Sequence, residues 1–183
     1  MHSSLLSQFL VDLKTHNHSL PILDLACGSG RNGLFCVEKN LPVVFSDVRT
    51  QALDDVKQTM NNDFDKYSSI LGKFWEVDFE IKNANPLAEN SYSTVMVFRY
   101  LHRPLIDKIK AAVAPNGLVV YETFTVAQAE LGRPKNPEFL LKVGELAEYF
   151  SDWQVLHYFE GTKTSDTGSN SQAVAQIVAR KPA

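Results

Sequence analysis

Cysteine is scarce in this sequence, with Cys27 and Cys36 the only two among 183 residues. They lie nine positions apart, and neither belongs to a CxxC pair or a histidine-rich stretch, which argues against a zinc site. We therefore expect no bound metal. Two thiols are also too few for a disulfide framework, and this favours a reducing compartment.

Long hydrophobic runs are also missing. No apolar run approaches the roughly 18 residues of a membrane-spanning helix, and residues 1–20 lack the basic start and apolar stretch of a signal peptide. These absences predict a cytoplasmic protein without membrane partners. The net charge of −3 gives no sign of a protein that coats nucleic acid. A length of 183 residues with 44% hydrophobic residues suits one domain with its own core.

Short apolar runs alternate with helical patterns along most of the chain. The predicted strands cover residues 21–25, 41–46, 71–77, 94–98, 118–124, 153–159 and 173–179. The predicted helices cover residues 4–14, 31–39, 50–60, 104–113 and 137–150. This alternation predicts an α/β domain with a doubly wound, mostly parallel sheet and helices on both faces. The last two strands are joined by a polar loop at 161–172 without a crossover helix, so the last strand should be antiparallel.

A glycine-rich turn follows the first predicted strand. Residues 24–33 read DLACGSGRNG, and Gly28, Gly30 and Gly33 satisfy GxGxxG between a strand and a helix. Backbone N–H groups at such a turn suit an anionic group. The pattern alone is also compatible with simple turn geometry.

Asp24, four residues before the first glycine, separates the readings of this turn. A carboxylate there would repel the pyrophosphate of a dinucleotide. It suits instead the ammonium and sulfonium of S-adenosylmethionine, whose carboxylate the turn amides and Arg31 could bind. The alternative is that Asp24 only caps the turn.

Two more acids stand at strand ends. Asp47 follows Gly28 by nineteen residues, where an acid can accept hydrogen bonds from ribose hydroxyls, or else it caps the helix that starts near Thr50. Asp78 precedes Phe79, and the pair could bind an adenine amino group and ring; the alternative is a solvated acid beside a core phenylalanine. All three acids should meet at the carboxyl edge of the sheet, where open α/β sheets bind ligands.

Five segments together resemble the class I S-adenosylmethionine-dependent methyltransferases. They are DLACGSGRNG (24–33), FSD (45–47), VDF (77–79), VFRYLHRPL (97–105) and APNG (114–117). The Gly-Arg-Asn step resembles the tellurite-resistance branch, and the likeness runs from about residue 20 to 180. It implies a Rossmann-like, seven-stranded sheet with an antiparallel last strand, and S-adenosyl-L-methionine as cofactor.

The resemblance implies cofactor contacts at Asp24, Gly28, Gly30, Asp47, Asp78 and Phe79. We predict further cofactor contacts at Ala26, Arg31, Val48, Phe98 and Arg99. Many members of this family have glycine in place of Ala26, and we expect only tighter packing from the alanine. In this scheme residues 1–20 form an N-terminal helix, 21–124 the cofactor-binding half, and 125–183 an acceptor loop, a helix and the closing strands.

Methyl transfer needs a nucleophile in line with the methyl carbon, so positioning supplies much of the catalysis. At the end of the fourth strand, His102 is the candidate general base and Tyr100 a donor that orients the acceptor. The alternative for His102 is a residue that only packs at a helix N-terminus.

The acceptor site should involve the fifth strand and the loop at 125–136. The predicted substrate-binding residues are Arg103, Tyr121, Glu122, Arg133 and Lys135. With Arg99, the three cations could form a rim that binds a small anionic acceptor, or they are ordinary solvated surface charges. About twenty residues before the first strand leave little room for an RNA-binding domain, so a nucleic-acid partner is less expected than a small molecule.

Two other functions compete with this interpretation. GxGxxG and Asp47 also fit an NAD-dependent oxidoreductase, against which stand Asp24, the antiparallel ending and the lack of a substrate domain. A non-catalytic module that binds S-adenosylmethionine fits the same residues.

Overall fold

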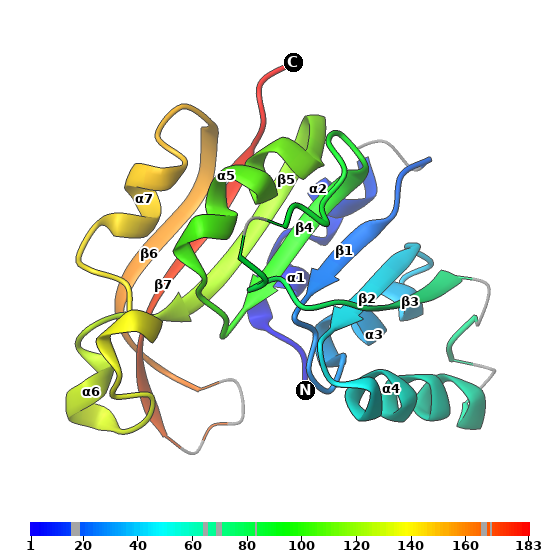
Figure 1. Cartoon of the computed structure of the whole chain (residues 1–183), viewed down its shortest axis with the longest axis horizontal. Coiled ribbons are helices and arrows are strands. Elements are labelled where there is room, and N and C mark those ends of the chain that lie inside the picture. Colours follow the sequence, from blue (N-terminus) through cyan, green and yellow to red (C-terminus); the bar gives the residue numbers. More distant parts are fainter. Residues whose placement is uncertain (16–18, 64–65, 69–70, 83, 166–167, 169) are drawn as a thin grey trace.

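Seven strands form one sheet at the centre of the molecule. The computed structural model describes residues 1–15, 19–63, 66–68, 71–82, 84–165, 168 and 170–183. The strand order is β3-β2-β1-β4-β5-β7-β6, and helices cover both faces of the sheet (Figure 1). Neighbours among β1 to β5 pair in parallel, whereas β7 pairs antiparallel with both β5 and β6. The predicted fold, including the antiparallel last strand, is confirmed.

The strands are β1 (Ile22–Leu25), β2 (Val43–Asp47), β3 (Gly72–Glu76), β4 (Tyr92–Phe98), β5 (Val113–Phe124), β6 (Gln154–Thr164) and β7 (Ser171–Arg180). The α-helices are α1 (Ser4–Gln8), α2 (Leu10–Thr15), α3 (Arg31–Glu38), α4 (Thr50–Asn62), α5 (Ile106–Ala112), α6 (Gln128–Leu131) and α7 (Glu145–Tyr149). Short 3-10 turns η2 (Arg103–Leu105) and η3 (Pro137–Phe139) precede α5 and α7. No helix among these residues is long and apolar enough to cross a membrane.

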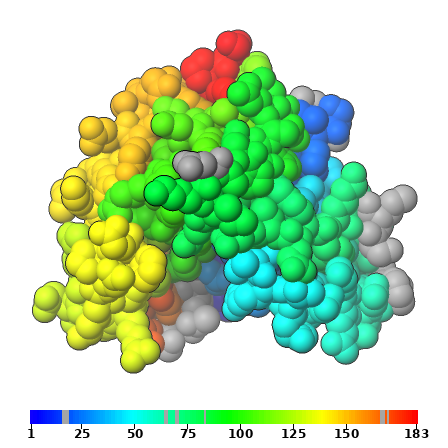
Figure 2. All heavy atoms as spheres, viewed as in Figure 1, coloured from blue at the N-terminus to red at the C-terminus, as the bar shows by residue number. Residues whose placement is uncertain are grey.

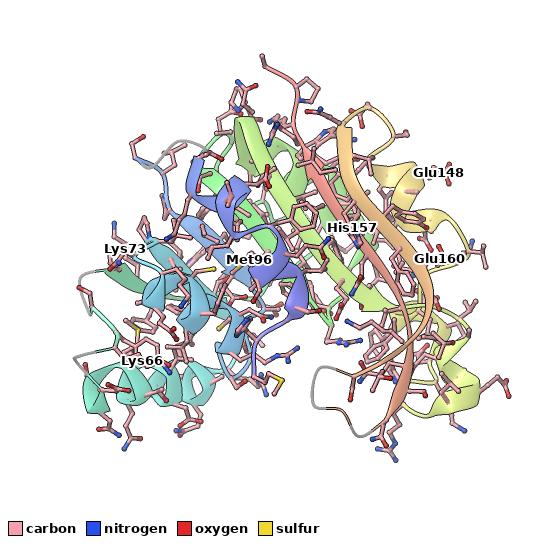
Figure 3. All side chains as sticks on the ribbon, turned by 180° about the vertical axis from the view of Figure 1, so that it is seen from behind. Lys66, Lys73, Met96, Glu148, His157 and Glu160 are labelled. Atoms are coloured by element: carbon pink, nitrogen blue, oxygen red, sulfur yellow. The ribbon has the colours of Figure 1, made fainter. Side chains whose placement is uncertain are left out.

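The central strands are apolar on both sides because both faces of the sheet are covered. Alternate residues of β4 enter two different cores: Val95 and Val97 pack with α5 and α7, and Met96 packs with α1 to α4. Viewed from behind, the N-terminal helices cross the middle of the sheet near Met96 (Figure 3). The sheet is therefore held between two layers, and its carboxyl edge stays open for a site.

Two helix predictions were wrong. The periodicity of residues 4–14 predicted one helix, but the structure has α1 and α2, divided at Phe9, whose φ and ψ of −105° and 20° leave the helical region. The predicted helix at 137–150 is mostly irregular, with only η3 and α7 within it. Leu141 there forms an isolated bridge with Thr125, and Gly144 has a left-handed φ of 76°, which suits glycine.

The closing strands are longer than predicted. β6 continues to Thr164 and β7 begins at Ser171, so that only residues 165–170 join them. The predicted loop at 161–172 is therefore a hairpin connection, of which residues 166, 167 and 169 lie outside the described part. The long hairpin carries Lys163 and Gln172 past the carboxyl end of β5, toward the predicted site.

Candidate active site

The glycine turn lies between β1 and α3 at the carboxyl edge. Gly28 and Gly30 adopt left-handed φ values of 56° and 65°, which a glycine reaches without strain. Gly33 has a different role, because a Cβ atom there would lie 2.3 Å from Phe45 and 2.8 Å from the Asp24 carboxylate. The third glycine thus lets α3 pack directly on the sheet.

Asp24 combines the two predicted roles. Its Oδ2 atom accepts a 2.9 Å hydrogen bond from the Gly33 amide, so it does cap the turn, and it is only 2% exposed. It also lines a pocket of about 270 Å³ with Ala26, Gly28, Arg31, Phe98 and other residues. Burial raises the pKa of this carboxyl from 3.8 to about 7. A buried carboxyl of this kind favours a cation beside it.

Asp47 lies at the end of β2 and already has several partners. Its oxygens accept hydrogen bonds from the Gly28 amide at 2.8 Å and the Arg49 amide at 3.0 Å, and the Arg49 Nε atom lies 3.1 Å away. Burial opposes ionisation, but these partners outweigh it and lower the pKa of Asp47. The carboxylate is therefore held ionised and oriented.

A second pocket, of about 450 Å³, lies along the carboxyl ends of β2 and β3. Its lining includes Asp47, Val48, Asp78 and Phe79, as well as Ala26, Arg49, Glu80, Arg99 and Tyr100. Ala26, Arg49 and Arg99 line both pockets, so the two are contiguous. We call them together the strand-end crevice, and their volume is in the range of ordinary ligand sites.

Arg99 stands where β4 ends. Its φ of 61° is left-handed, a conformation that costs a non-glycine residue about 1–2 kcal/mol and is concentrated at functional sites. Its guanidinium lies 2.9 Å from an oxygen of the fully buried Glu122 and 4.4 Å from the ring centre of Phe124. The surrounding structure thus fixes this side chain in place.

A third pocket, of about 370 Å³, adjoins the strand-end crevice and shares Glu80, Arg99 and Tyr100 with it. Its other lining residues are Leu101, Phe124, Pro134 and Phe139; we call it the loop pocket. The surface is indented at this edge, between the cyan segment at the start of α4 and the yellow-green segment around residues 125–140 (Figure 2).

The sequence matches the model of the family described as "Tellurite resistance protein TehB" over residues 10–174. The chain belongs to the TehB family. The predicted resemblance to class I S-adenosylmethionine-dependent methyltransferases of the tellurite-resistance branch is thereby confirmed.

Relatives of this TehB-family chain also carry the name TehB. Two strains of Haemophilus influenzae have a protein named probable S-adenosyl-L-methionine-dependent methyltransferase TehB, 28% identical over 171 residues. The alignment covers 87% of this chain and 57% of each relative, so the chain spans little more than half of their length.

Solved structures support the fold. The crystal structure of TehB from Haemophilus influenzae superimposes with a TM-score of 0.76 at 22% identity, covering 99% of this chain and 62% of that one. A structure described as S-adenosylmethionine-dependent methyltransferases from Methanosarcina mazei gives 0.68 at 14% identity, covering 98% of both chains.

Most of the cofactor contacts that we predicted line the strand-end crevice of this TehB-family chain. Ten of the eleven residues line its two pockets: Asp24, Ala26, Gly28, Arg31, Asp47, Val48, Asp78, Phe79, Phe98 and Arg99. Gly30 is absent from both linings and serves as the N-cap of α3. Ala26 has a left-handed φ of 52°, so the alanine brings backbone strain and not only the tighter packing we expected.

The predicted catalytic and acceptor residues are less well gathered. Tyr100 lines the crevice and the loop pocket, but His102 lines a different cavity with Lys82, Lys108 and neighbouring residues. Tyr121 is fully buried, and its hydroxyl donates to the Tyr100 carbonyl at 3.0 Å. The ring of Tyr121 belongs to the core, and its predicted contact with a substrate stays a prediction.

The four predicted rim cations do not assemble. The Arg103 guanidinium donates to both oxygens of Glu145, at 2.6 and 2.9 Å, and to the carbonyls of Glu138 and Leu140. Arg103 and its neighbours hold the pKa of Glu145 down at about 2. Arg133 and Lys135 are exposed and line none of the three pockets. Arg103 thus acts as a structural clamp in this structure, and its predicted substrate contact stays a prediction.

Sequence reasoning missed several lining residues. Arg49 and Glu80 each stand two positions after a predicted strand-end acid, so the spacing could have indicated them. Glu122 is buried and bound by Arg99 and Lys163, which removes it from the substrate contacts we predicted. Phe124 and Pro134 belong to the strand and the loop that we expected at the acceptor site, although we did not name these two residues. Phe139 enters the loop pocket through tertiary packing, for which the sequence has no local signal.

Proposed function

We propose that this chain is an S-adenosylmethionine-dependent methyltransferase that acts on a small acceptor. The observation that carries the proposal is Asp24, a carboxyl 2% exposed, whose pKa is raised to about 7 and which lines the crevice. A buried acid at this point favours a cationic ligand and opposes a pyrophosphate. The cofactor is therefore expected to place its charged amino-acid part beside Asp24.

The crevice residues fit the remaining parts of this cofactor. Asp47 is held ionised by the Gly28 and Arg49 amides, and such a carboxylate can accept hydrogen bonds from ribose hydroxyls. Asp78 and Phe79 line the same pocket and would hold the adenine. Arg31 lines the same pocket as Asp24 and would bind the carboxylate of the cofactor.

The loop pocket is the proposed acceptor site, because it shares Glu80, Arg99 and Tyr100 with the crevice. When bound, the cofactor supplies a methyl group on a sulfonium, whose carbon–sulfur bond breaks as an acceptor lone pair bonds to the methyl carbon. Tyr100 would orient the acceptor by donating from its hydroxyl. Burial and the nearby Glu80 raise the pKa of this phenol, so it keeps its proton at neutral pH.

His102 stays a candidate general base, although it lines neither the crevice nor the loop pocket. It lines a neighbouring cavity that shares Phe79 and Glu80 with the crevice. We predicted a small anionic acceptor from four cations, and of these four only Arg99 lines the crevice or the loop pocket. The location of the acceptor is accordingly proposed from pocket continuity and not from these cations.

The test is the affinity for S-adenosylhomocysteine, measured by calorimetry at pH 6, 7 and 8. A cationic ligand lowers the pKa of Asp24, so the affinity should rise with pH up to about 7 and then level off. Asp24→Asn should weaken binding by about 10- to 100-fold, the effect of one charge-assisted hydrogen bond, and should remove this pH dependence. Asp55→Asn changes an exposed acid on α4 and is the matched control.

Two results would contradict the proposal. One is unchanged affinity in Asp24→Asn, and the other is thermal stabilisation by NADH but not by S-adenosylhomocysteine. A non-catalytic module would bind the cofactor in the same way but methylate no acceptor in a broad screen.

A further inference from the structure

We infer that the loop pocket selects a small, uncharged and largely apolar acceptor, and that Phe139 is a specificity-determining residue. This inference rests on the proposed function and narrows its acceptor class. It depends on which residues line the pocket and on the charges that they bring.

The walls of the loop pocket are mostly hydrocarbon. Leu101, Phe124, Pro134 and Phe139 make up four of the seven lining residues of a pocket of about 370 Å³. This volume suits a ring or a short branched chain, and ligand pockets of this kind bind largely through apolar contact. Tyr100 adds one hydroxyl at the boundary with the strand-end crevice.

The charges around this pocket are balanced. Among the described residues Arg99 is its one lining cation, and the buried Glu122 lies 2.9 Å from the Arg99 guanidinium and 3.3 Å from Lys163, which with Glu80 makes two carboxylates for two cations. The face of that guanidinium lies over the Phe124 ring, 4.4 Å from the ring centre. Glu80 supplies a carboxylate to the same lining. An anionic acceptor would leave water and approach Glu80, and both effects disfavour it.

The backbone around Phe139 is held by contacts that do not involve the Phe139 side chain. Arg103 donates to the carbonyl oxygens of Glu138 and Leu140, on either side of Phe139. Asn136 accepts a hydrogen bond from the Glu138 amide at 3.1 Å. The Phe139 side chain itself is 51% exposed, so it can be exchanged while the backbone keeps its position.

The experiment measures the binding of two matched probes to protein saturated with S-adenosylhomocysteine. The probes are benzyl mercaptan and its 4-carboxylate analogue, compared by calorimetry at pH 6.5, where the benzyl thiols stay protonated. We expect the uncharged probe to bind at least about tenfold more tightly, because the carboxylate must be desolvated. In Phe139→Lys the carboxylate probe should gain about fivefold from the new cation, and the uncharged probe should lose affinity.

Val143→Lys is the matched control. Val143 is 81% exposed on the same segment and does not line the pocket, so this lysine should leave the preference unchanged. Equal or tighter binding of the carboxylate, binding of neither probe, or an equal effect of both lysines would overturn the inference. Failure to bind S-adenosylhomocysteine would instead overturn the proposed function itself, and the inference with it.

Discussion

The carboxyl edge of the sheet has two halves that use charge in opposite ways. At the ends of β1 and β2, Asp24 and Asp47 accept hydrogen bonds chiefly from main-chain amides and line the crevice. At the ends of β4 and β5, Arg99 forms a closed pair with the buried Glu122, which Lys163 also contacts. The acids of the first half line an open crevice, and the second half leaves an apolar pocket. We call them the open half and the closed half. The partner of a charged residue, more than its position, decides its role.

The largest expected effect concerns the closed pair. Glu122→Ala leaves Arg99 and Lys163 without their buried carboxylate, and breaking such a pair costs 3–5 kcal/mol when the site is fully buried. Both cations are about one fifth exposed, so we expect the free energy of unfolding to fall by about 3 kcal/mol in a urea titration. Glu148→Ala, at an exposed acid on α7, should change it by less than about 0.5 kcal/mol. Similar losses in the two variants would remove the distinction between the halves.

The next effect has the opposite sign and concerns the open half. Asp24 has a folded pKa of about 7 against 3.8 unfolded, so the native state binds more protons between these values, and stability must fall as pH rises from about 4 to about 7. Asp24→Asn removes this fall. It should stabilise the protein at pH 8 by on the order of 2 kcal/mol, because a three-unit shift is worth about 4 kcal/mol and an imperfectly paired amide takes back part of it. Thermal unfolding from pH 4 to 8 measures this, and a parallel pH dependence in both proteins would refute it.

The smallest effect concerns the glycine turn. Ala26→Gly should stabilise the protein by about 0.5–1 kcal/mol, since relief of a left-handed alanine outweighs the entropy of glycine. Ala127→Gly, at an exposed residue with an ordinary φ of −65°, should destabilise by a similar amount. Matched chemical unfolding curves compare the two, and a loss in both variants would show that the turn is not strained.

The open half could be predicted from the sequence because its signals are local. Each of β1, β2 and β3 is a short run followed by an acid or a glycine turn, and Asp24, Asp47 and Asp78 stand at or just after the strand ends. Parallel pairing then brings these positions to one edge without further information. Eight of the ten predicted cofactor contacts that line the crevice do so for this reason, and the other two, Phe98 and Arg99, lie where β4 ends.

The closed half could not be predicted because its determinants are distant in the sequence. Arg103 pairs with Glu145, 42 residues away, and Arg99 contacts Gln172 on the closing hairpin at 2.6 Å. The leucines of 137–150 follow a helical period, yet Leu141 pairs with Thr125 and its neighbours remain extended. Tertiary pairing overrides local propensity here. Three predicted acceptor contacts likewise have partners distant in the sequence: Arg103 pairs with Glu145, Tyr121 with the Tyr100 carbonyl, and Glu122 with Lys163.

The Arg103 clamp has a consequence for how this protein could change. The Arg103 guanidinium donates hydrogen bonds to main-chain carbonyl oxygens, which every amino acid carries, and to one carboxylate outside the pocket lining. A new side chain at 139, between these two carbonyls, would therefore inherit the same anchored backbone. A library randomised at 139 should yield folded members at high frequency, with chemical preferences as varied as the residues introduced.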